Sequence, residues 1–306
     1  MLQHVRYVDL PPHVGAGGFD HGAVHRRSGR VYVAHTANDA VDVIDGPAGR
    51  FVASIPDLPA VAGALVSDER DLVFTSNRGE NTVGIFEVAA PATVAKVGVG
   101  IRPNGLAYDP GRHRLLAAHV GDPAVPGSFT VSVVDVATRA AVAEVAVPGR
   151  TRWTIYDPVA DAFHVNIMAP AVVAVVDAAR PAVTRVVPIP SAGPHGLDLD
   201  VATRRLFCAC DGGRLVELGA ADGKLSREVP LAGVPDVIFF NAALNHLYVA
   251  IGDPGVVEVF DTRTLERVQT VSTEGGAHTL AFDAERNLVY AFLPATHRAA
   301  VYVDQK

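Results

Sequence analysis

The sequence has little of what defines several common protein classes. Its 306 residues include only two cysteines, Cys208 and Cys210, so a disulfide scaffold is excluded. No apolar run is long enough to cross a bilayer, and the longest, near Ala169–Val176, stops at Asp177. The N-terminus has neither the basic segment nor the apolar segment of a signal peptide. We therefore expect a cytoplasmic protein, or a periplasmic or secreted one if a leader precedes this sequence.

Charge is also sparse. Charged residues make up 19% of the chain and the net charge is −7, which argues against a nucleic-acid partner or an anionic membrane surface. The hydrophobic share of 49% excludes intrinsic disorder, because such a chain can bury enough apolar surface to fold. The expected partner is a small-molecule substrate, and the expected state is a monomer or a weak homo-oligomer.

What the sequence does contain is an internal repeat. One unit reads PNGLAYDPGRHRLLAAH and begins at Pro103, and its second residue recurs about 42 residues apart along the chain. One interval is longer because GDPAVPGS (Gly121–Ser128) is inserted there. The other units begin at Phe19, Val61, Thr151, Pro194, Pro235 and Ala277.

Each unit contains four short strand-like segments rich in valine. The chain ends just after the seventh third strand, and the missing fourth strand matches HVRYVDL (His4–Leu10) at the other end. This strand would close the ring and remove exposed sheet edges. The alternative of seven βαβ units is disfavoured, because no window has a sustained apolar period of 3.6. The sequence predicts an all-β, single-domain protein over residues 1–306, a seven-bladed β-propeller whose last blade is closed by the N-terminal strand.

Several units also resemble a known repeat. The segments RVYVAHTANDAVDVID, HLYVAIGDPGVVEVFD and NLVYAFL are similar to the YVTN-type (YncE-like) propeller repeat. The resemblance covers nearly the whole chain and implies the fold strongly. It implies the function weakly, because propellers host binding proteins, lyases, hydrolases and redox enzymes.

Candidate functional residues come from two columns of the repeat. In a propeller, the starts of the innermost strands and the ends of the second strands lie on one face of the disc. The acids that end the third strands recur in nearly every blade, so we interpret them as turn residues. The first column instead changes type from blade to blade, which indicates an asymmetric pocket. The first column is Asp20, Ala62, Asn104, Arg152, His195, Asp236 and His278, and the second is His35, Asn77, His119, Ile167, Cys210, Ile251 and Leu293.

The first hypothesis for this face is a divalent metal site. Imidazoles from several blades, with a carboxylate and an amide nearby, are suitable ligands for Zn²⁺, Mn²⁺ or Fe²⁺. No compact motif such as HExxH supports it. The predicted metal ligands are His35, His119, His195, His278, Asp20 and Asn104.

A second, more distant resemblance leads to a reaction. SMP-30 and gluconolactonase-type propellers bind calcium through acid and amide side chains at innermost-strand starts, and Asp20, Asn104 and Asp236 occupy similar positions. The resemblance implies a metal-dependent hydrolase, lactonase- or esterase-like, although the histidines here favour a softer metal than calcium. His278 would then be the general base and Arg152 would stabilise the developing oxyanion, with Asp236 as the third catalytic candidate. The predicted substrate pocket comprises His21, Asn77, Trp153 and Cys210.

Other functions remain open at this point. A propeller lyase could use a histidine of the same face as its base. A non-catalytic propeller could use the face to bind a ligand or a partner, and a histidine there could also ligate haem iron. Trp153, the only tryptophan, would either fill the space between blades or form a stacking wall for a ligand.

Overall fold

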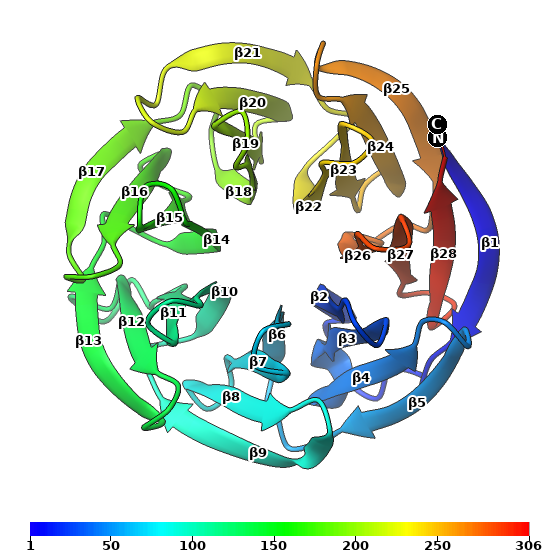
Figure 1. Cartoon of the computed structure of the whole chain (residues 1–306), viewed down its shortest axis with the longest axis horizontal. Helices are drawn as coiled ribbons and strands as arrows, with labels where there is room; N and C mark the ends of the chain where they lie inside the picture. The colour runs from blue at the N-terminus through cyan, green and yellow to red at the C-terminus, as the bar shows by residue number, and fades with distance from the viewer. Residues whose placement is uncertain (306) are drawn as a thin grey trace.

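Seven four-stranded antiparallel sheets surround a central channel (Figure 1). The computed structural model describes residues 1–305, apart from the side chain of Ala92. The prediction of an all-β, seven-bladed propeller is confirmed, and the seven strands nearest the axis belong to the repeated segments found in the sequence. We number the blades one to seven from β2 onward.

The two inner strands of each blade form a hairpin that points toward the axis. The innermost strands are β2 (Phe19–His25), β6 (Val61–Ser67), β10 (Pro103–Asp109), β14 (Thr151–Asp157), β18 (Pro194–Asp200), β22 (Pro235–Asn241) and β26 (Thr279–Asp283). The second strands are β3 (Arg30–His35), β7 (Leu72–Asn77), β11 (Arg114–His119), β15 (Ala162–Ile167), β19 (Arg205–Cys210), β23 (His246–Ile251) and β27 (Leu288–Leu293).

The two outer strands complete each blade. The third strands are β4 (Ala40–Asp45), β8 (Thr82–Glu87), β12 (Thr130–Asp135), β16 (Val172–Asp177), β20 (Arg214–Gly219), β24 (Val256–Asp261) and β28 (Arg298–Asp304). The outermost strands are β5 (Arg50–Ile55), β9 (Ala90–Gly98), β13 (Ala140–Ala146), β17 (Val183–Pro188), β21 (Leu225–Pro230), β25 (Glu266–Ser272) and β1 (Leu2–Asp9), and a short 3-10 helix, η1 (Thr36–Asn38), follows β3.

The N-terminal strand closes the ring, as the sequence predicts. β1 pairs antiparallel with β28, from Leu2 opposite Asp304 to Asp9 opposite Arg298. The side-chain amide of Gln269 in blade six also bonds both backbone groups of Leu2. The last blade, which contains β26, β27 and β28, is therefore completed by a strand from the start of the chain.

The hydrophobic core lies between blades. One cluster joins Leu116 and Ala118 of blade three to Phe163 and Val165 of blade four. The second and third strands are buried on both faces, which explains why they read as continuous valine-rich runs without strict alternation. Such packing fixes the angle between neighbouring blades and so the positions of their innermost strands.

Several of the acids that end the third strands are turn residues, as predicted. Asp45, Asp135 and Asp177 each accept a backbone N–H from the residue three positions later. Asp304 is an exception, because its carboxylate receives the N-terminal ammonium, His246 and Tyr248 instead. These hydrogen bonds satisfy backbone donors in tight turns and leave the acids no role at the channel.

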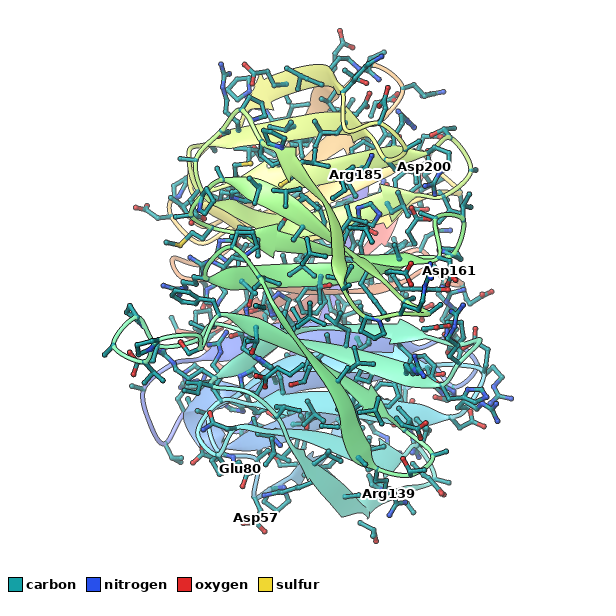
Figure 2. The ribbon with its side chains drawn as sticks, turned by 90° about the vertical axis from the view of Figure 1, so that its left-hand side faces the viewer. Asp57, Glu80, Arg139, Asp161, Arg185 and Asp200 are labelled. Atoms are coloured by element: carbon teal, nitrogen blue, oxygen red, sulfur yellow. The ribbon has the colours of Figure 1, made fainter. Side chains whose placement is uncertain are left out.

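The ring is a thick disc with two different faces. Figure 2 shows Glu80, from the loop after β7, on one face and Asp161 and Asp200, from the hairpins after β14 and β18, on the other. Innermost strands start at the first face and end at the second. Within residues 1–305 no helix is long and apolar enough to cross a membrane.

Candidate functional site

The starts of the innermost strands bring together charged side chains from different blades. His195, in β18, lies between two carboxylates: its Nδ1 is 2.7 Å from Asp211 Oδ1, and its Nε2 is 3.1 Å from Asp236 Oδ1. Burial alone would lower the pKa of His195, but Asp236 and Asp211 outweigh it and raise the pKa to about 9. His195 is therefore an imidazolium at neutral pH.

Asp236, at the start of β22, is the centre of this group. Its carboxylate is approached by the Nε2 atoms of three imidazoles, His195 at 3.1 Å, His278 at 3.8 Å and His21 at 4.0 Å. Burial would raise the pKa of Asp236, but the three imidazoles hold it well below its usual range. Asp236 is thus an anion surrounded by imidazoles from three blades.

A second carboxylate belongs to blade one, two blades along the ring from Asp236. Asp20 accepts a bond from its neighbour His21 at 2.6 Å, and its other oxygen is 3.3 Å from Arg78. Arg78 also donates to the side-chain oxygen of Asn104. Burial would raise the pKa of Asp20, but Arg78 and His21 lower it overall. Asn104 is therefore an acceptor for a guanidinium here.

Arginines crowd the same end of the channel. Arg152, in β14, has its guanidinium 3.4 Å from Asp211 and 3.6 Å from the sulfur of Met168. Arg150, half-buried two residues earlier, forms no ion pair with any residue in the described chain. Burial, and then the like charges of Arg152, Arg102 and Arg78, lower its pKa. We call this end of the channel the arginine mouth, defined by Arg78, Arg102, Arg150, Arg152, His195 and Asp236.

A stacked pair of rings divides the channel below the arginine mouth. His21 of β2 and Trp153 of β14 stack with centroids 3.9 Å apart and planes 4° from parallel. β2 and β14 lie on opposite sides of the ring, so the pair spans the axis (Figure 1). Trp153 also packs against the core between blades four and five. Trp153 therefore belongs to the core and also lies in the channel, and its role as a stacking wall for a ligand stays a prediction.

Two of the predicted metal ligands lie inside blades and away from this group. His35 is fully buried, with its Nδ1 2.7 Å from Asp42 and its ring against Phe19 and His13. His119 is also fully buried, bonds Thr130 at 2.8 Å, and has its pKa lowered to about 4 by burial. The prediction that these imidazoles meet the others at the axis is wrong. Both are at second-strand ends, whose side chains point between blades.

The other predicted ligands reach the arginine mouth but do not form a ligand set. Both ring nitrogens of His195 face carboxylates, Asp20 is engaged by His21 and Arg78, and Asn104 is held by Arg78. Among residues 1–305 no group of three or more His, Cys, Asp or Glu side chains is arranged to hold a metal ion. Nearby guanidiniums would also repel a cation. The residues at the mouth therefore do not fit a resident divalent metal.

Two predicted pocket residues are also core residues. Asn77 is fully buried and bonds Thr75 and Thr82. Cys210 is fully buried with its sulfur 3.8 Å from that of Cys208, and the pKa of Cys208 is raised by its bond to that thiol and by burial. Neither side chain faces the channel, whereas the predicted pocket residues His21 and Trp153 do.

The sequence prediction also missed three residues of the arginine mouth, Arg78, Arg102 and Arg150. Arg78 comes one position after a second-strand end, directly following Asn77. Adjacent residues of a strand point to opposite sides, so the column chosen from the sequence is one residue early. Arg102 and Arg150 directly precede β10 and β14, outside both columns. A search for arginines flanking both columns would have found the cationic cluster.

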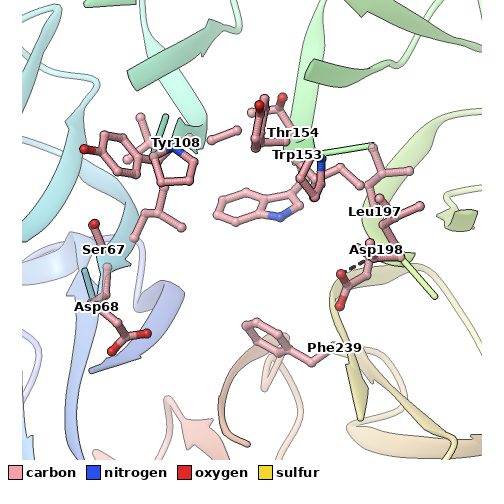
Figure 3. Close-up of a pocket in the computed structure, with 18 of the residues that line it drawn as sticks. Ser67, Asp68, Tyr108, Trp153, Thr154, Leu197, Asp198 and Phe239 are labelled. Carbon is pink, nitrogen blue, oxygen red and sulfur yellow. Dashed lines mark hydrogen bonds between the residues drawn. The ribbon is translucent and has the colours of Figure 1, made fainter. Parts of the chain in front are cut away.

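The hollow part of the channel is at its other end. Two adjoining cavities, of about 510 and 670 Å³, are lined by the second halves of the innermost strands and the turns after them. Trp153 lines the first of them and His21 lines neither. Figure 3 shows Trp153 in the middle of this space with Tyr108, Asp198 and Phe239 around it. We call this space the turn-side cavity, defined by Arg26, Asp68, Tyr108, Trp153, Asp198 and Phe239.

Comparisons with known proteins support the fold alone. A chain of Kuenenia stuttgartiensis hydrazine synthase superposes with a TM-score of 0.82 at 14% identity, covering 98% of this chain and 97% of that one. A chain from the crystal structure of a mitotic checkpoint complex gives 0.83 at 12% identity, covering 99% and 92%. No protein-family model and no curated protein matches the chain. The YVTN-type and SMP-30-type resemblances therefore rest on the sequence patterns alone.

Proposed function

We propose that the arginine mouth binds the oxyanion group, carboxylate or phosphate, of a small organic molecule. The observation that carries this proposal is Arg150, a half-buried guanidinium with no carboxylate bonded to it among residues 1–305 and three like charges nearby. The four guanidiniums and the His195 imidazolium outnumber the carboxylates of Asp20, Asp211 and Asp236. A bound oxyanion would relieve this excess, and arginine forks suit the geometry of carboxylate and phosphate groups.

Unused hydrogen-bond donors point the same way. The Nε atoms of Arg78, Arg150 and Arg152 are buried and have no acceptor in the described chain. A buried donor without an acceptor is costly, and the cost is removed when a ligand supplies one. The metal-dependent hydrolase predicted from the sequence has no such support, because two of its predicted ligands lie inside blades and the others are engaged by arginine or carboxylate side chains.

Anion titrations test this proposal directly. Calorimetry at low ionic strength would compare acetate, citrate, inorganic phosphate and an uncharged diol. We expect the anions to bind and Arg150→Gln to weaken them about tenfold, because one charge-assisted bond is lost. Arg50→Gln is the matched control, since Arg50 is 68% exposed on an outer strand. No anion binding, or equal loss in both variants, would overturn the proposal.

A second candidate function is proton abstraction from the bound anion, the chemistry of the predicted lyase. It is favoured by His278, whose side chain is 33% exposed, with its Nε2 3.8 Å from Asp236. A bound carboxylate would place its α-carbon beside this imidazole, which would take the C–H proton. Proton NMR in D₂O would detect α-hydrogen exchange in a panel of hydroxy acids. Exchange that survives His278→Ala would exclude this candidate and leave the mouth as a binding site.

A further inference from the structure

The turn-side cavity has a different chemistry from the arginine mouth. Its walls carry the aromatic rings of Tyr108, Trp153, Tyr156 and Phe239 between aliphatic side chains. In Figure 3, Asp68 and Asp198 lie on opposite sides, with the rings of Trp153 and Phe239 between them. A concave, mostly apolar space with a few polar groups is typical of a small-molecule site.

Asp198 is the unusual group in this cavity. Its carboxylate accepts backbone N–H groups from Leu199 at 2.8 Å and Phe240 at 2.7 Å, and no Lys, Arg or His of the described chain pairs with it. Burial is the main reason that the pKa of Asp198 rises to about 6. Asp198 is therefore an anion at neutral pH whose charge no protein cation offsets.

The other acids around the cavity are already neutralised or exposed. Asp68 lies 3.4 Å from Arg26 and 3.9 Å from His25. Asp200 is 2.9 Å from Arg205. Asp198, which lies beside the aromatic rings, is therefore the carboxylate in the cavity that still lacks a cationic partner.

We propose that the turn-side cavity binds a small organic cation, an alkylammonium, between the Asp198 carboxylate and the faces of Trp153 and Phe239. An ammonium group would offset the half-buried charge of Asp198, and its alkyl substituents would contact the rings through cation–π attraction. A neutral apolar ligand would leave Asp198 unmatched. A bare metal ion would lose its hydration against aromatic walls, and within residues 1–305 no group of three metal-ligating side chains is arranged to hold one.

This site is independent of the anion site proposed above. The two share no charged residue, and the stacked His21 and Trp153 lie between them. Failure of anion binding at the arginine mouth would therefore not affect the proposal for the turn-side cavity.

The single tryptophan makes the test direct. Trp153 lines the cavity, so its fluorescence reports on an occupant without labelling. Choline and its uncharged isostere 3,3-dimethyl-1-butanol have the same shape and differ in charge. We expect choline to change the fluorescence and to bind about tenfold more tightly than the isostere, with calorimetry giving the affinities.

Two variants test whether choline binds in the turn-side cavity. Asp198→Asn should weaken choline about tenfold, and Phe239→Leu should weaken it several-fold while keeping the cavity apolar. Asp222→Asn is the control for net charge, because Asp222 is 51% exposed and away from the channel. Thermal unfolding would confirm that each variant is folded. Equal binding of choline and its isostere, absence of choline binding at millimolar concentration, or unchanged affinity in both cavity variants would overturn the proposal.

Discussion

The two ends of the channel are built from the same seven strands and have opposite chemistry. At the arginine mouth, guanidiniums and imidazoles exceed the carboxylates; Arg78, Arg152 and His195 form ion pairs, whereas Arg150 forms none within the described chain. In the turn-side cavity, aromatic rings dominate and Asp198 has only backbone donors. The repeat fixes the backbone of each innermost strand but not the side chains at its two ends. One propeller can therefore carry two unrelated sites about one strand length apart.

The largest expected effect is on stability at the arginine mouth. Replacing His195 with Gln removes the cation between Asp211 and Asp236 and leaves them only the longer contacts with Arg152 and with His278 and His21, so we expect the free energy of unfolding at pH 7 to fall by about 3 kcal/mol. Asp198→Asn should cost less, because no ion pair is broken. Urea unfolding of both variants measures the difference. A larger loss for Asp198→Asn would reverse the comparison between the two ends.

The contacts of His195 with Asp211 and Asp236 also lead us to expect a loss of stability at alkaline pH. The pKa of His195 is raised from 6.5 to about 9 in the folded protein, so its contribution is fully present below pH 6.5 and is lost as pH rises through 9. The loss should be on the order of 3 kcal/mol between these values. Unfolding midpoints measured from pH 6 to 10 would show the decline. His195→Gln should remove it, and a decline that persists in that variant has another origin.

At the turn-side cavity, we expect acid rather than alkali to have the effect. The quantity that changes should be choline affinity rather than stability. The pKa of Asp198 is about 6, so lowering the pH to 5 protonates most of it, and we expect choline affinity to fall about tenfold. Trp153 fluorescence titrations between pH 5 and 8 measure the change. The other charged groups that line the cavity are Arg26, Asp68, Glu69 and Asp200. If Asp198→Asn keeps the same pH dependence, one of these groups is responsible.

Salt should weaken anion binding at the arginine mouth more than choline binding in the turn-side cavity, and this difference should be smaller than the effects of pH. The arginine mouth is open to solvent, so raising ionic strength to physiological levels should weaken anion binding several-fold. Choline binding should change less than about twofold, because one half-buried carboxylate, Asp198, attracts choline, whereas several charged groups act on an anion at the mouth. Parallel titrations at two salt concentrations measure both. A stronger salt effect on choline than on phosphate would contradict the assignment of choline to the turn-side cavity.

The smallest expected effect is that of metal ions. The residues at the mouth do not fit a divalent cation, so Zn²⁺, Mn²⁺, Fe²⁺ or Ca²⁺ should leave the melting temperature unchanged. Elemental analysis of the purified protein should find less than one metal per chain. Stoichiometric metal lost in His278→Ala but kept in His119→Ala would restore the metal hypothesis at the mouth.

The fold could be predicted from the sequence because propeller blades repeat. A spacing of about 42 residues, together with a spare N-terminal strand, determines the number of blades and the closure. The first column of the site was also predictable. The starts of innermost strands face the axis in every blade, so Asp20, Arg152, His195, Asp236 and His278 had to approach one another.

The rest of the site depends on side-chain direction and on burial, which spacing does not determine. His35 and His119 are at the correct end of their strands but turn into the core, whereas the residues that follow second strands, Arg78 and Asp211, turn toward the channel. The turn-side cavity had no signal in the sequence, because Asp198 and Phe239 read as ordinary members of strands. The cavity is unusual because no cation lies beside the Asp198 carboxylate. This can be seen only once the chain is folded.

The His21–Trp153 stack affects how solvent and solutes can move through the central channel. Two rings from opposite blades meet near the axis, so they narrow the passage between the two faces. A solute that crosses the disc would have to pass beside the stack or separate its rings. An occupant of the turn-side cavity that turns the indole would therefore also move the imidazole stacked on it.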